Sequence, residues 1–473
     1  MTIIKEEELL SESLEEKVPS LENLKDIKET ISLEEKIKKV SLAFLKESEK
    51  TEVVVVSHFD TDGITSAAIM TKCLRRLDRK FSVKIVKSLE SPFIHSLPKN
   101  KIILFLDLSS GSLNHIKEAG LSNVFIVDHH ELDSKIPKGI EMVNPHLHNN
   151  EKISSSGLTY LFCKEIDPES KKSAKLAVLG MIGDLLEKEI DKLNNGILEE
   201  GEIKKKRGLL IYPSTRPINR ALEYCSNPYI PGVTGNPIGV LELLREAGIE
   251  PSRGQYRSLM EITEDEMKKL VTAIAIRNPK AAGEIVGDIF LIKFFNKLED
   301  ARELSAMINA CSRLGKSGTA LRFCMEVPGS RKEAEEIHIK YKQHIISGLD
   351  FASKADKVVG KSFVIINAKD QIKDTIVGTI ASILSNSSVY EKGTVITTMA
   401  YYEDKIKVSA RVCGRNASGS QRNVREILSA VVSEIGGEVG GHEFAAGCIL
   451  TRDKEKKFIE SLSKALEMEF VKI

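Results

Sequence analysis

The sequence lacks the cysteine pattern of a protein held together by disulfides or by structural zinc. Its seven cysteines are scattered over 473 residues, and no two of them form a CxxC pair. That spacing excludes a cysteine-based zinc site and a disulfide framework. We therefore predict that the thiols are reduced core residues of a protein in a reducing compartment.

Long apolar runs and a large net charge are also missing. No stretch of about 18 apolar residues occurs, and the first residues lack a basic segment followed by an apolar one. We expect a cytoplasmic protein without membrane contact. The net charge of +1 excludes a basic nucleic-acid coat protein, although a local basic patch can still bind a polyanion.

The common nucleotide-binding and nucleophile motifs are absent as well. GKSGTA at 315–320 lacks the upstream glycine and the preceding strand of a P-loop, so we predict a surface turn there. The basic run KKKR at 204–207 is predicted to be a solvated loop that could touch a phosphate backbone. No Ser-His-Asp or Cys-His arrangement has motif support.

The first half of the chain alternates strand-length and helical patterns. Residues 1–50 form a charged lead-in that ends in an amphipathic helix, SLEEKIKKVSLAFLKES. Between residues 51 and 190, helical stretches at 63–77 and 112–121 separate apolar runs at 53–57, 81–88, 101–109 and 123–130. This alternation predicts an α/β domain with a doubly wound parallel sheet.

The second half divides into a helical region and a smaller domain. Residues 191–355 are predicted to be mostly helical, with a long connecting helix at 335–355. The β signal returns near residue 358, where strand-length runs again alternate with helical patterns. We predict a second α/β domain over residues 356–473.

Acidic and imidazole side chains follow the strands of the first domain where each strand ends. In a parallel sheet, ligands collect outside the carboxyl ends of the strands, so these side chains can converge on one crevice. The candidates are His58, Asp60 and Asp62 after the first strand, Asp107 at the end of the third, Asp128, His129 and His130 at the end of the fourth, and Asp184 in the segment 173–186, after an apolar helix.

Gathering so many carboxylates in one place is unfavourable unless cations neutralise them. Carboxylates mixed with neutral imidazoles suit Mn²⁺ or Mg²⁺ better than thiolate-rich zinc sites do. The set is larger than one ion takes while leaving room for substrate. We therefore predict two metal ions, an arrangement that activates water and stabilises a phosphoryl transition state.

Five motifs carry a resemblance to a known family. HFDTDG, FLDLSSG, VDHHE and GMIGD resemble, in order, the four motifs of the DHH phosphoesterase superfamily, and GGHEFAAG at 440–447 resembles its DHHA1 domain. Within that superfamily the chain is most similar to RecJ-type single-strand exonucleases, and to their archaeal branch, the GINS-associated nucleases. The stretch RPINRALEYCSNPYIPGVTG at 216–235 carries the likeness to that branch.

The resemblance implies a role for each candidate residue and places the active site in a cleft between the two domains. His130 would face the scissile phosphate, and Asp128 would support the histidine pair. Gly440, Gly441 and His442 would bind the nucleotide end, together with Arg411 and Arg415. Both implied ions are divalent, with Mn²⁺ favoured over Mg²⁺. The implied metal ligands are His58, Asp60 and Asp107 for one ion and Asp62, Asp107, His129 and Asp184 for the other.

The implied activity is metal-dependent exonucleolytic hydrolysis of single-stranded DNA or RNA, with 5′→3′ direction favoured, in replication or repair with GINS. One alternative is a phosphodiesterase for short oligoribonucleotides or cyclic dinucleotides. Another is a replisome scaffold, like a eukaryotic relative whose metal motifs are degraded.

Each motif taken alone also has a plain structural interpretation. HFDTDG could be a loop with a capping aspartate, the histidine pair could lie on the surface, and Asp184 could cap a packed helix. GGHEFAAG could be a simple turn. Arg411 and Arg415 could each point to solvent, because alternate residues of a strand face opposite sides of the sheet.

Overall fold

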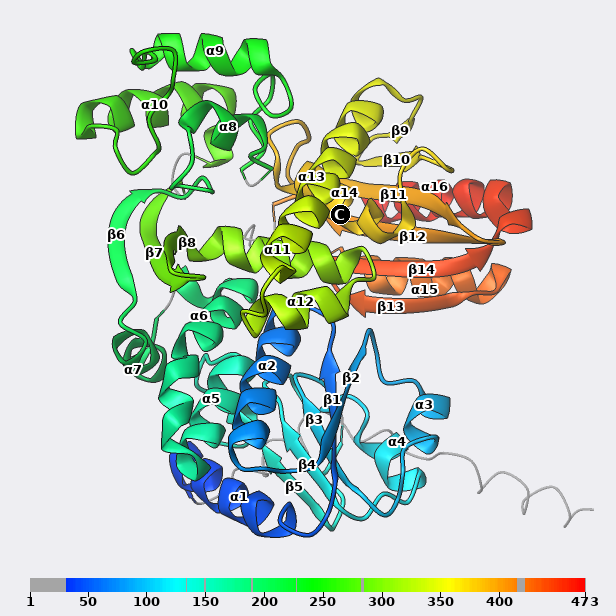
Figure 1. Ribbon diagram of the computed structural model, residues 1–473. Helices are drawn as coiled ribbons and strands as arrows, with labels where there is room; N and C mark the ends of the chain where they lie inside the picture. The colour runs from blue at the N-terminus through cyan, green and yellow to red at the C-terminus, as the bar shows by residue number, and fades with distance from the viewer. Residues whose placement is uncertain are drawn as a thin grey trace, which may run out of the picture. The chain divides into compact units, whose positions relative to one another are not determined.

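The computed structural model in Figure 1 describes residues 31–472, except for 133, 149, 189, 227, 282–284 and 415–421. The chain forms two compact units. The first contains the described residues up to Met181, the second contains those from Leu198 onward, and residues 182–197 are divided between them.

The first unit is built on a parallel five-stranded sheet, as predicted. Its strands occur in the order β2-β1-β3-β4-β5. Strands β3 and β4 are buried along their whole length, as their unbroken apolar runs require when helices cover both faces. The strands are β1 (Val53–His58), β2 (Phe81–Val86), β3 (Ile102–Leu106), β4 (Val124–Val127) and β5 (Ile140–Val143).

Helices complete this first unit. The predicted amphipathic helix is confirmed as α1, where Ser32 forms a capping box with Glu35 and Phe44 packs edge-on against Phe125 and Phe162. The helices are α1 (Leu33–Glu47), α2 (Thr61–Arg76), α3 (Ser91–His95), α4 (Leu113–Glu118) and α5 (Ser155–Ile166). Two further helices, α6 (Ala174–Gly183) and α7 (Lys192–Glu200), each begin in this unit and end in the second.

The middle of the chain is mostly helical, as predicted, but it also contains a small antiparallel sheet. This sheet has the order β6-β7-β8. The prediction of a loop for KKKR was wrong, because these residues are the four exposed residues that begin edge strand β6, which pairs with the mainly apolar strand β7. Cations on an edge strand discourage pairing with other chains. The strands are β6 (Lys204–Leu209), β7 (Val286–Phe294) and β8 (Lys297–Asp300).

The helices of this region include the predicted long one, which is confirmed as α13. Only the beginning of GKSGTA is a turn, because α12 starts at Ser317. The helices are α8 (Ile218–Glu223), α9 (Pro237–Glu246), α10 (Glu264–Arg277), α11 (Ala301–Arg313), α12 (Ser317–Cys324) and α13 (Ser330–Lys354).

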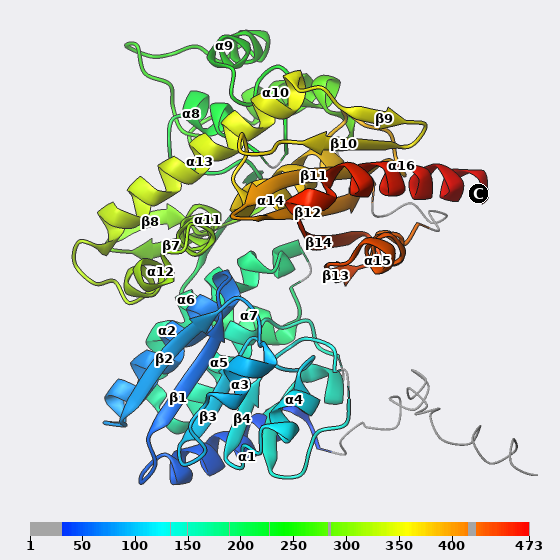
Figure 2. The ribbon, with the colours of Figure 1, turned by 90° about the vertical axis from the view of Figure 1, so that its right-hand side faces the viewer.

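A mixed six-stranded sheet forms the predicted C-terminal α/β domain, seen from the side in Figure 2. Alternate residues of β10 enter different cores: Phe363 and Ile365 pack with α15 and α16, whereas Val364 and Ile366 pack with α14. In the order β13-β14-β12-β11-β10-β9, the strands are β13 (Glu438–His442), β14 (Ala445–Thr451), β12 (Lys405–Val412), β11 (Val395–Tyr402), β10 (Phe363–Asn367) and β9 (Val358–Gly360). The helices are α14 (Asp374–Asn386), α15 (Val424–Ile435) and α16 (Glu455–Lys472).

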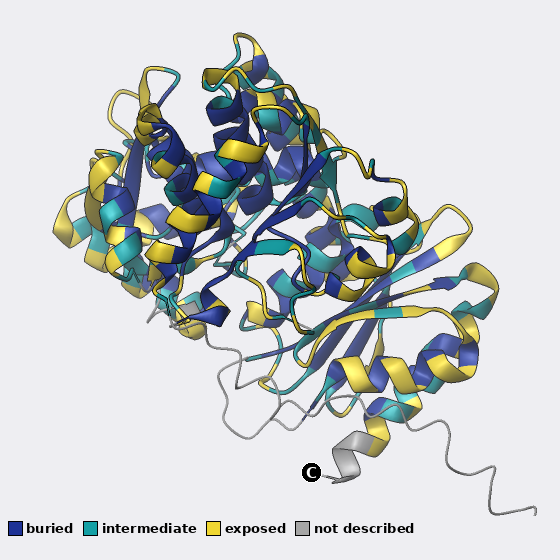
Figure 3. Cartoon of the chain, turned by 90° about the horizontal axis from the view of Figure 1, so that it is seen from below, coloured by how far each residue is buried: buried dark blue, intermediate teal, exposed yellow. Residues whose placement is uncertain are grey.

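Burial follows these layers. Figure 3 shows most strand residues buried and the exposed residues mainly on outer helix faces and in loops. All seven cysteines are buried, as predicted. Among the described helices, none combines the length and the apolar character that crossing a bilayer requires.

Candidate metal centre

The strand order of the first sheet reverses next to β1. From β1 the chain first adds β2 on one side and later adds β3, β4 and β5 on the other. Ligands of such sheets bind where the strand order reverses, outside the carboxyl ends of the strands. His58 ends β1 and Asp107 directly follows β3, so these two residues flank the reversal point.

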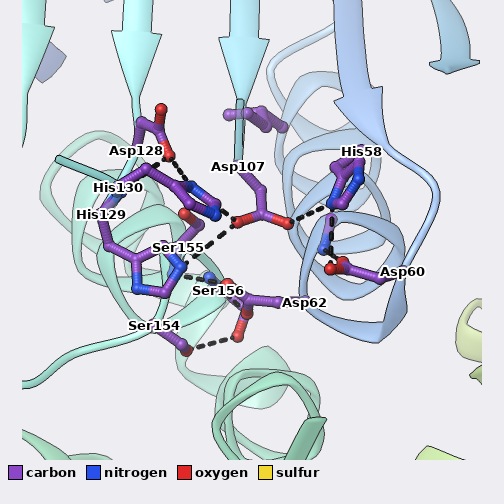
Figure 4. A network of polar contacts seen from close by, with 12 residues as sticks. His58, Asp60, Asp62, Asp107, Asp128, His129, His130, Ser154, Ser155 and Ser156 are labelled. Carbon is purple, nitrogen blue, oxygen red and sulfur yellow. Dashed lines mark hydrogen bonds and ion pairs between the residues drawn. The ribbon is translucent and has the colours of Figure 1, made fainter. Parts of the chain in front are cut away.

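Asp107 lies at the centre of the cluster. Its carboxylate is 1% exposed, and Figure 4 shows it between His58 on one side and His129 and His130 on the other. The backbone of Asp107 has φ +61°, and that of Ser109 has φ +100°. Such left-handed backbone is uncommon outside glycine and concentrates at functional sites. This turn ends β3 and directs the following residues back toward the sheet edge.

His58, Asp60 and Asp107 form the first group of candidate ligands. His58 Nδ1 lies 2.9 Å from Asp60 Oδ2 and 3.4 Å from Asp107 Oδ2. One ligand atom from each residue lies within 4.8 Å of the others. The sequence predicted that these three residues hold one ion, and the structure brings them together.

Local structure fixes this group. Asp60 caps α2 by accepting a hydrogen bond from the Gly63 N–H (3.0 Å), and the Ser57 hydroxyl donates to the Gly63 carbonyl (2.6 Å). A Cβ at position 63 would lie within 3.0 Å of the His58 carbonyl oxygen. Glycine at this position therefore lets the start of α2 pack directly against the end of β1.

Asp62, His129 and Asp184 form a second group, in which one ligand atom from each residue lies within 4.8 Å of the others. Asp62 is fully buried. Its Oδ2 accepts from the Ser155 N–H (2.7 Å) and its Oδ1 from the Ser156 N–H (2.9 Å), at the start of α5. The sequence predicted these three residues together with Asp107 for the second ion, and Asp107 is not part of this group. The sequence gave no sign that α5 binds Asp62.

Asp107 also joins a third group with His129 and His130. His129 Nε2 lies 3.6 Å from Asp107 Oδ1, and His130 Nδ1 lies 3.9 Å from the same oxygen. His130 makes its shorter contact with Asp128, whose Oδ1 is 2.8 Å from His130 Nδ1. The His130 side chain is 53% exposed, which is suitable for a ring that meets a substrate.

Several hydrogen bonds hold the Asp128 carboxylate. Fully buried, it accepts from the Ser110 N–H (2.9 Å), the Ser110 hydroxyl (2.6 Å) and the His129 N–H (2.8 Å). Asn144 Nδ2 in turn donates to Ser110 Oγ (3.1 Å) and to the His130 carbonyl (2.9 Å). Sequence reasoning missed Ser110 and Asn144. Each follows a strand end, but β5, which carries Asn144, was itself not predicted.

These contacts control the charges. Burial opposes ionisation of Asp128, yet hydrogen bonds from His130 and Ser110 outweigh it and hold the pKa of Asp128 below its usual range. The hydrogen bond to Asp128 raises the pKa of His130. Burial lowers the pKa of His129, which favours the neutral imidazole that a metal ligand must be.

The donor set fits divalent cations. The buried carboxylates of Asp62 and Asp107 converge with partly exposed carboxylates and imidazoles and without a thiolate, as suits Mn²⁺ or Mg²⁺. Asp107 contributes to more than one group and uses different oxygens toward His58 and His129. A carboxylate placed in this way can serve two ions at once.

Three family models match the chain in order. They are the N-terminal domain of the DHH family at residues 52–183, the DHH-CID domain at 211–283 and the DHHA1 domain at 360–468. The chain therefore contains matches to the DHH and DHHA1 domains that characterise the DHH/DHHA1 phosphoesterase superfamily. The candidate ligands up to His130 lie inside the DHH match, and Asp184 directly follows it.

Several known proteins resemble this DHH/DHHA1 chain over most of its length. An uncharacterized protein of Methanocaldococcus jannaschii is 28% identical over 436 residues, which cover 87% of this chain and 92% of the relative. The structure of exonuclease RecJ bound to manganese has a TM-score of 0.58 at 17% identity, covering 91% of this chain and 94% of its own. The structure of CDC45 from Entamoeba histolytica has a TM-score of 0.67 at 11% identity, and the match covers 91% of this chain and 99% of the CDC45 chain. At these identities the two structures show a shared fold.

The described residues among the predicted substrate residues of the DHHA1 domain lie on strands β13 and β12, which flank β14. Gly440, Gly441 and His442 form the exposed end of edge strand β13. Both His442 and Arg411 are in register with Ala445 of β14, one on each side, so they project from the same face of the sheet.

The Arg411 guanidinium lies against its own domain. It donates to Ser382 Oγ (3.0 Å) and to the carbonyls of Ala410 (2.8 Å) and Ala446 (3.2 Å). Arg415 lies outside the described residues. Substrate binding by Arg411 and Arg415 stays a prediction.

Proposed function

We propose that this protein is a two-metal exonuclease that hydrolyses phosphodiester bonds from an end of single-stranded nucleic acid. One observation supports the proposal above the others: buried Asp107 belongs both to the group with His58 and Asp60 and to a group with His129. Two ligand groups that share a carboxylate are suited to a pair of cations, and a pair of cations is suited to phosphoryl transfer.

The proposed ligands of one ion are His58, Asp60 and Asp107, and those of the other are Asp62, Asp107, His129 and Asp184. When bound, two divalent cations supply Lewis-acid charge neutralisation and lower the pKa of a water molecule. Mn²⁺ is favoured and Mg²⁺ is the second choice, in keeping with the manganese bound to the RecJ structure.

The chain's own residues bind and orient the substrate. His130 is assigned to the scissile phosphate, because its exposed ring is held on one side by the Asp128 carboxylate. That hydrogen bond favours the protonated imidazole, which can donate to a phosphate oxygen. In the DHHA1 domain, the backbone of Gly440 and Gly441 and the side chain of His442 would bind the nucleotide end, with Arg411 and Arg415 beside them.

Single-stranded DNA is the proposed substrate, RNA is a second one, and 5′→3′ is the favoured direction. We further propose a cytoplasmic enzyme that acts in replication or repair with GINS. The Asp184→Ala variant separates this partnership from catalysis. We expect the variant to lose hydrolysis and still to co-purify with GINS.

Digestion of end-labelled single strands tests the function. Wild-type protein should shorten 5′- and 3′-labelled 20-mers of DNA or RNA stepwise with Mn²⁺ or Mg²⁺, and not with EDTA. His129→Ala should abolish the shortening, whereas His115→Ala, at an exposed position of α4, should not change it. Shortening that persists in EDTA or in the His129 variant would exclude the two-metal enzyme.

The same assay addresses the alternatives. Cleavage of dimers and pentamers but not of 20-mers would indicate a phosphodiesterase for short oligonucleotides. A folded wild-type protein that binds GINS and cuts no substrate would indicate a scaffold.

A further inference from the structure

Asp62 is held from one side by the start of α5. The Ser154 side chain caps this helix by accepting from the Gly157 N–H (3.2 Å). The backbone N–H groups of the two residues between them are directed at Asp62. Ser155 and Ser156 donate one hydrogen bond to each carboxylate oxygen. The positive end of the helix dipole adds to this attraction for the anion.

Helix α6 covers Asp62 from another side, and it does so with a glycine. A Cβ added to Gly180 would lie within 3.0 Å of Asp62 Oδ1, Ser156 Oγ and Thr65 Oγ1, closer than real Cβ atoms come. The Ser156 hydroxyl already donates to the Ala177 carbonyl of α6 (3.1 Å). Helices α5 and α6 therefore meet directly over the carboxylate.

None of these three neighbours can move aside at little cost. Asp62 is tied to two backbone N–H groups, and Ser156 is tied to α6. The Thr65 hydroxyl donates to the carbonyls of Thr61 (2.9 Å) and Asp62 (3.0 Å). A side chain at position 180 must shift either the Asp62 carboxylate or the helix itself.

We propose that Gly180 and the first two N–H groups of α5 position Asp62 for the second metal ion. This inference rests on the proposed function, because it assumes that Asp62 and His129 bind an ion. Gly180 acts through Asp62 and is a positioning residue. Together, Gly180 and these two N–H groups orient both oxygens of the buried Asp62 carboxylate before an ion binds.

Gly180→Ala tests the inference in the full-length protein, with Mn²⁺ itself as the probe. Isothermal titration should show two ions bound by the wild type. The variant should bind one ion with unchanged affinity and the other about 10- to 100-fold more weakly, the usual cost of disturbing a group that orients a ligand. The electron paramagnetic resonance spectrum should change from that of a coupled Mn²⁺ pair to that of a single ion.

Two glycine variants are matched controls for Gly180→Ala. Gly196→Ala lies in a helix where nothing approaches a Cβ within 4 Å. Gly348→Ala, in α13, introduces a tight contact with Ile380 Cδ1 (3.0 Å) and changes no residue of α5, α6 or the ligand groups. Both should keep two ions at wild-type affinity, which separates a specific effect on Asp62 from helix strain in general.

Ser155→Pro serves if Gly180→Ala does not fold. The first position of a helix tolerates proline, and the change removes the N–H that donates to Asp62 Oδ2, together with the Ser155 hydroxyl. The same ion should then bind more weakly. If a folded Gly180→Ala protein binds both ions with wild-type affinity, the inference is overturned and the proposed function is left intact. If Gly180→Ala does not fold, the same result for Ser155→Pro has the same meaning. A wild-type protein that binds no Mn²⁺ refutes the proposed function itself.

Discussion

At the scale of single residues, the site depends on groups that would never contact an ion. Asn144 donates to Ser110 Oγ and to the His130 carbonyl, and Ser110 donates to Asp128. These bonds link the ends of β3, β4 and β5. They leave Asp128 one preferred orientation toward the His130 ring.

Asn144→Ala should therefore reduce hydrolysis about 10-fold or more with little change in Mn²⁺ affinity, because groups that orient active-site residues usually contribute this much. The rate of single-strand digestion and the titrated Mn²⁺ affinity measure the two effects. Asn195→Ala, at an exposed position of α7, is the control. In a His130→Ala background the Asn144 change should add nothing. If the Asn144 change reduces hydrolysis by the same factor in the His130→Ala protein, Asn144 does not act through His130.

At the scale of elements, the site depends on how closely α2 approaches β1. Gly63 lies in the first turn of α2, and a Cβ there would press on the His58 carbonyl oxygen. The same turn carries Asp62 and is capped by Asp60. Packing and ligand placement are thus fixed by one backbone contact.

Gly63→Ala should lower the free energy of unfolding by about 1–3 kcal/mol, the usual cost of overpacking. Urea denaturation without metal measures this. Gly111→Ala, where nothing lies within 4 Å of a Cβ, should be close to neutral. Equal stability of the two variants would show that the approach of α2 to β1 is not tight.

The elements that the sequence predicted well are those with an unmistakable period or length. Strands β3 and β4 are unbroken apolar runs, β1 opens with four valines, and α1 has one clear apolar face. Strand β5 was missed because Ile140–Val143 is short and contains a glutamate. Strand β6 was missed because its four cations conceal a strand whose pairing partner lies about 80 positions away in sequence.

At the scale of the whole molecule, the candidate ligands could be predicted because parallel strands bring their carboxyl ends together. Residues that orient those ligands could not, since a buried serine or asparagine has no periodic signal and its role depends on tertiary contacts. Gly180 is an example, because only the packing of α6 over Asp62 shows why a side chain is excluded there.

Metal binding should stabilise the whole protein, because ions that bind only the folded state favour it. Each Mn²⁺ at 100 times its dissociation constant should add about 2.7 kcal/mol. Calorimetry with Mn²⁺ and with EDTA should show a rise in Tm for the wild type, a smaller rise for Asp60→Asn and none for Asp107→Asn. A full rise in the Asp107 variant would show that Asp107 does not serve both ions.

The central claim is that buried Asp107 unites two metal sites into one hydrolytic centre. The most direct test measures how fast wild type and Asp107→Asn shorten a 5′-labelled single strand of DNA as Mn²⁺ is varied. We predict Mn²⁺-dependent stepwise shortening by the wild type and no shortening above the EDTA background by the variant. Shortening by a folded Asp107→Asn protein at the wild-type rate would contradict the claim.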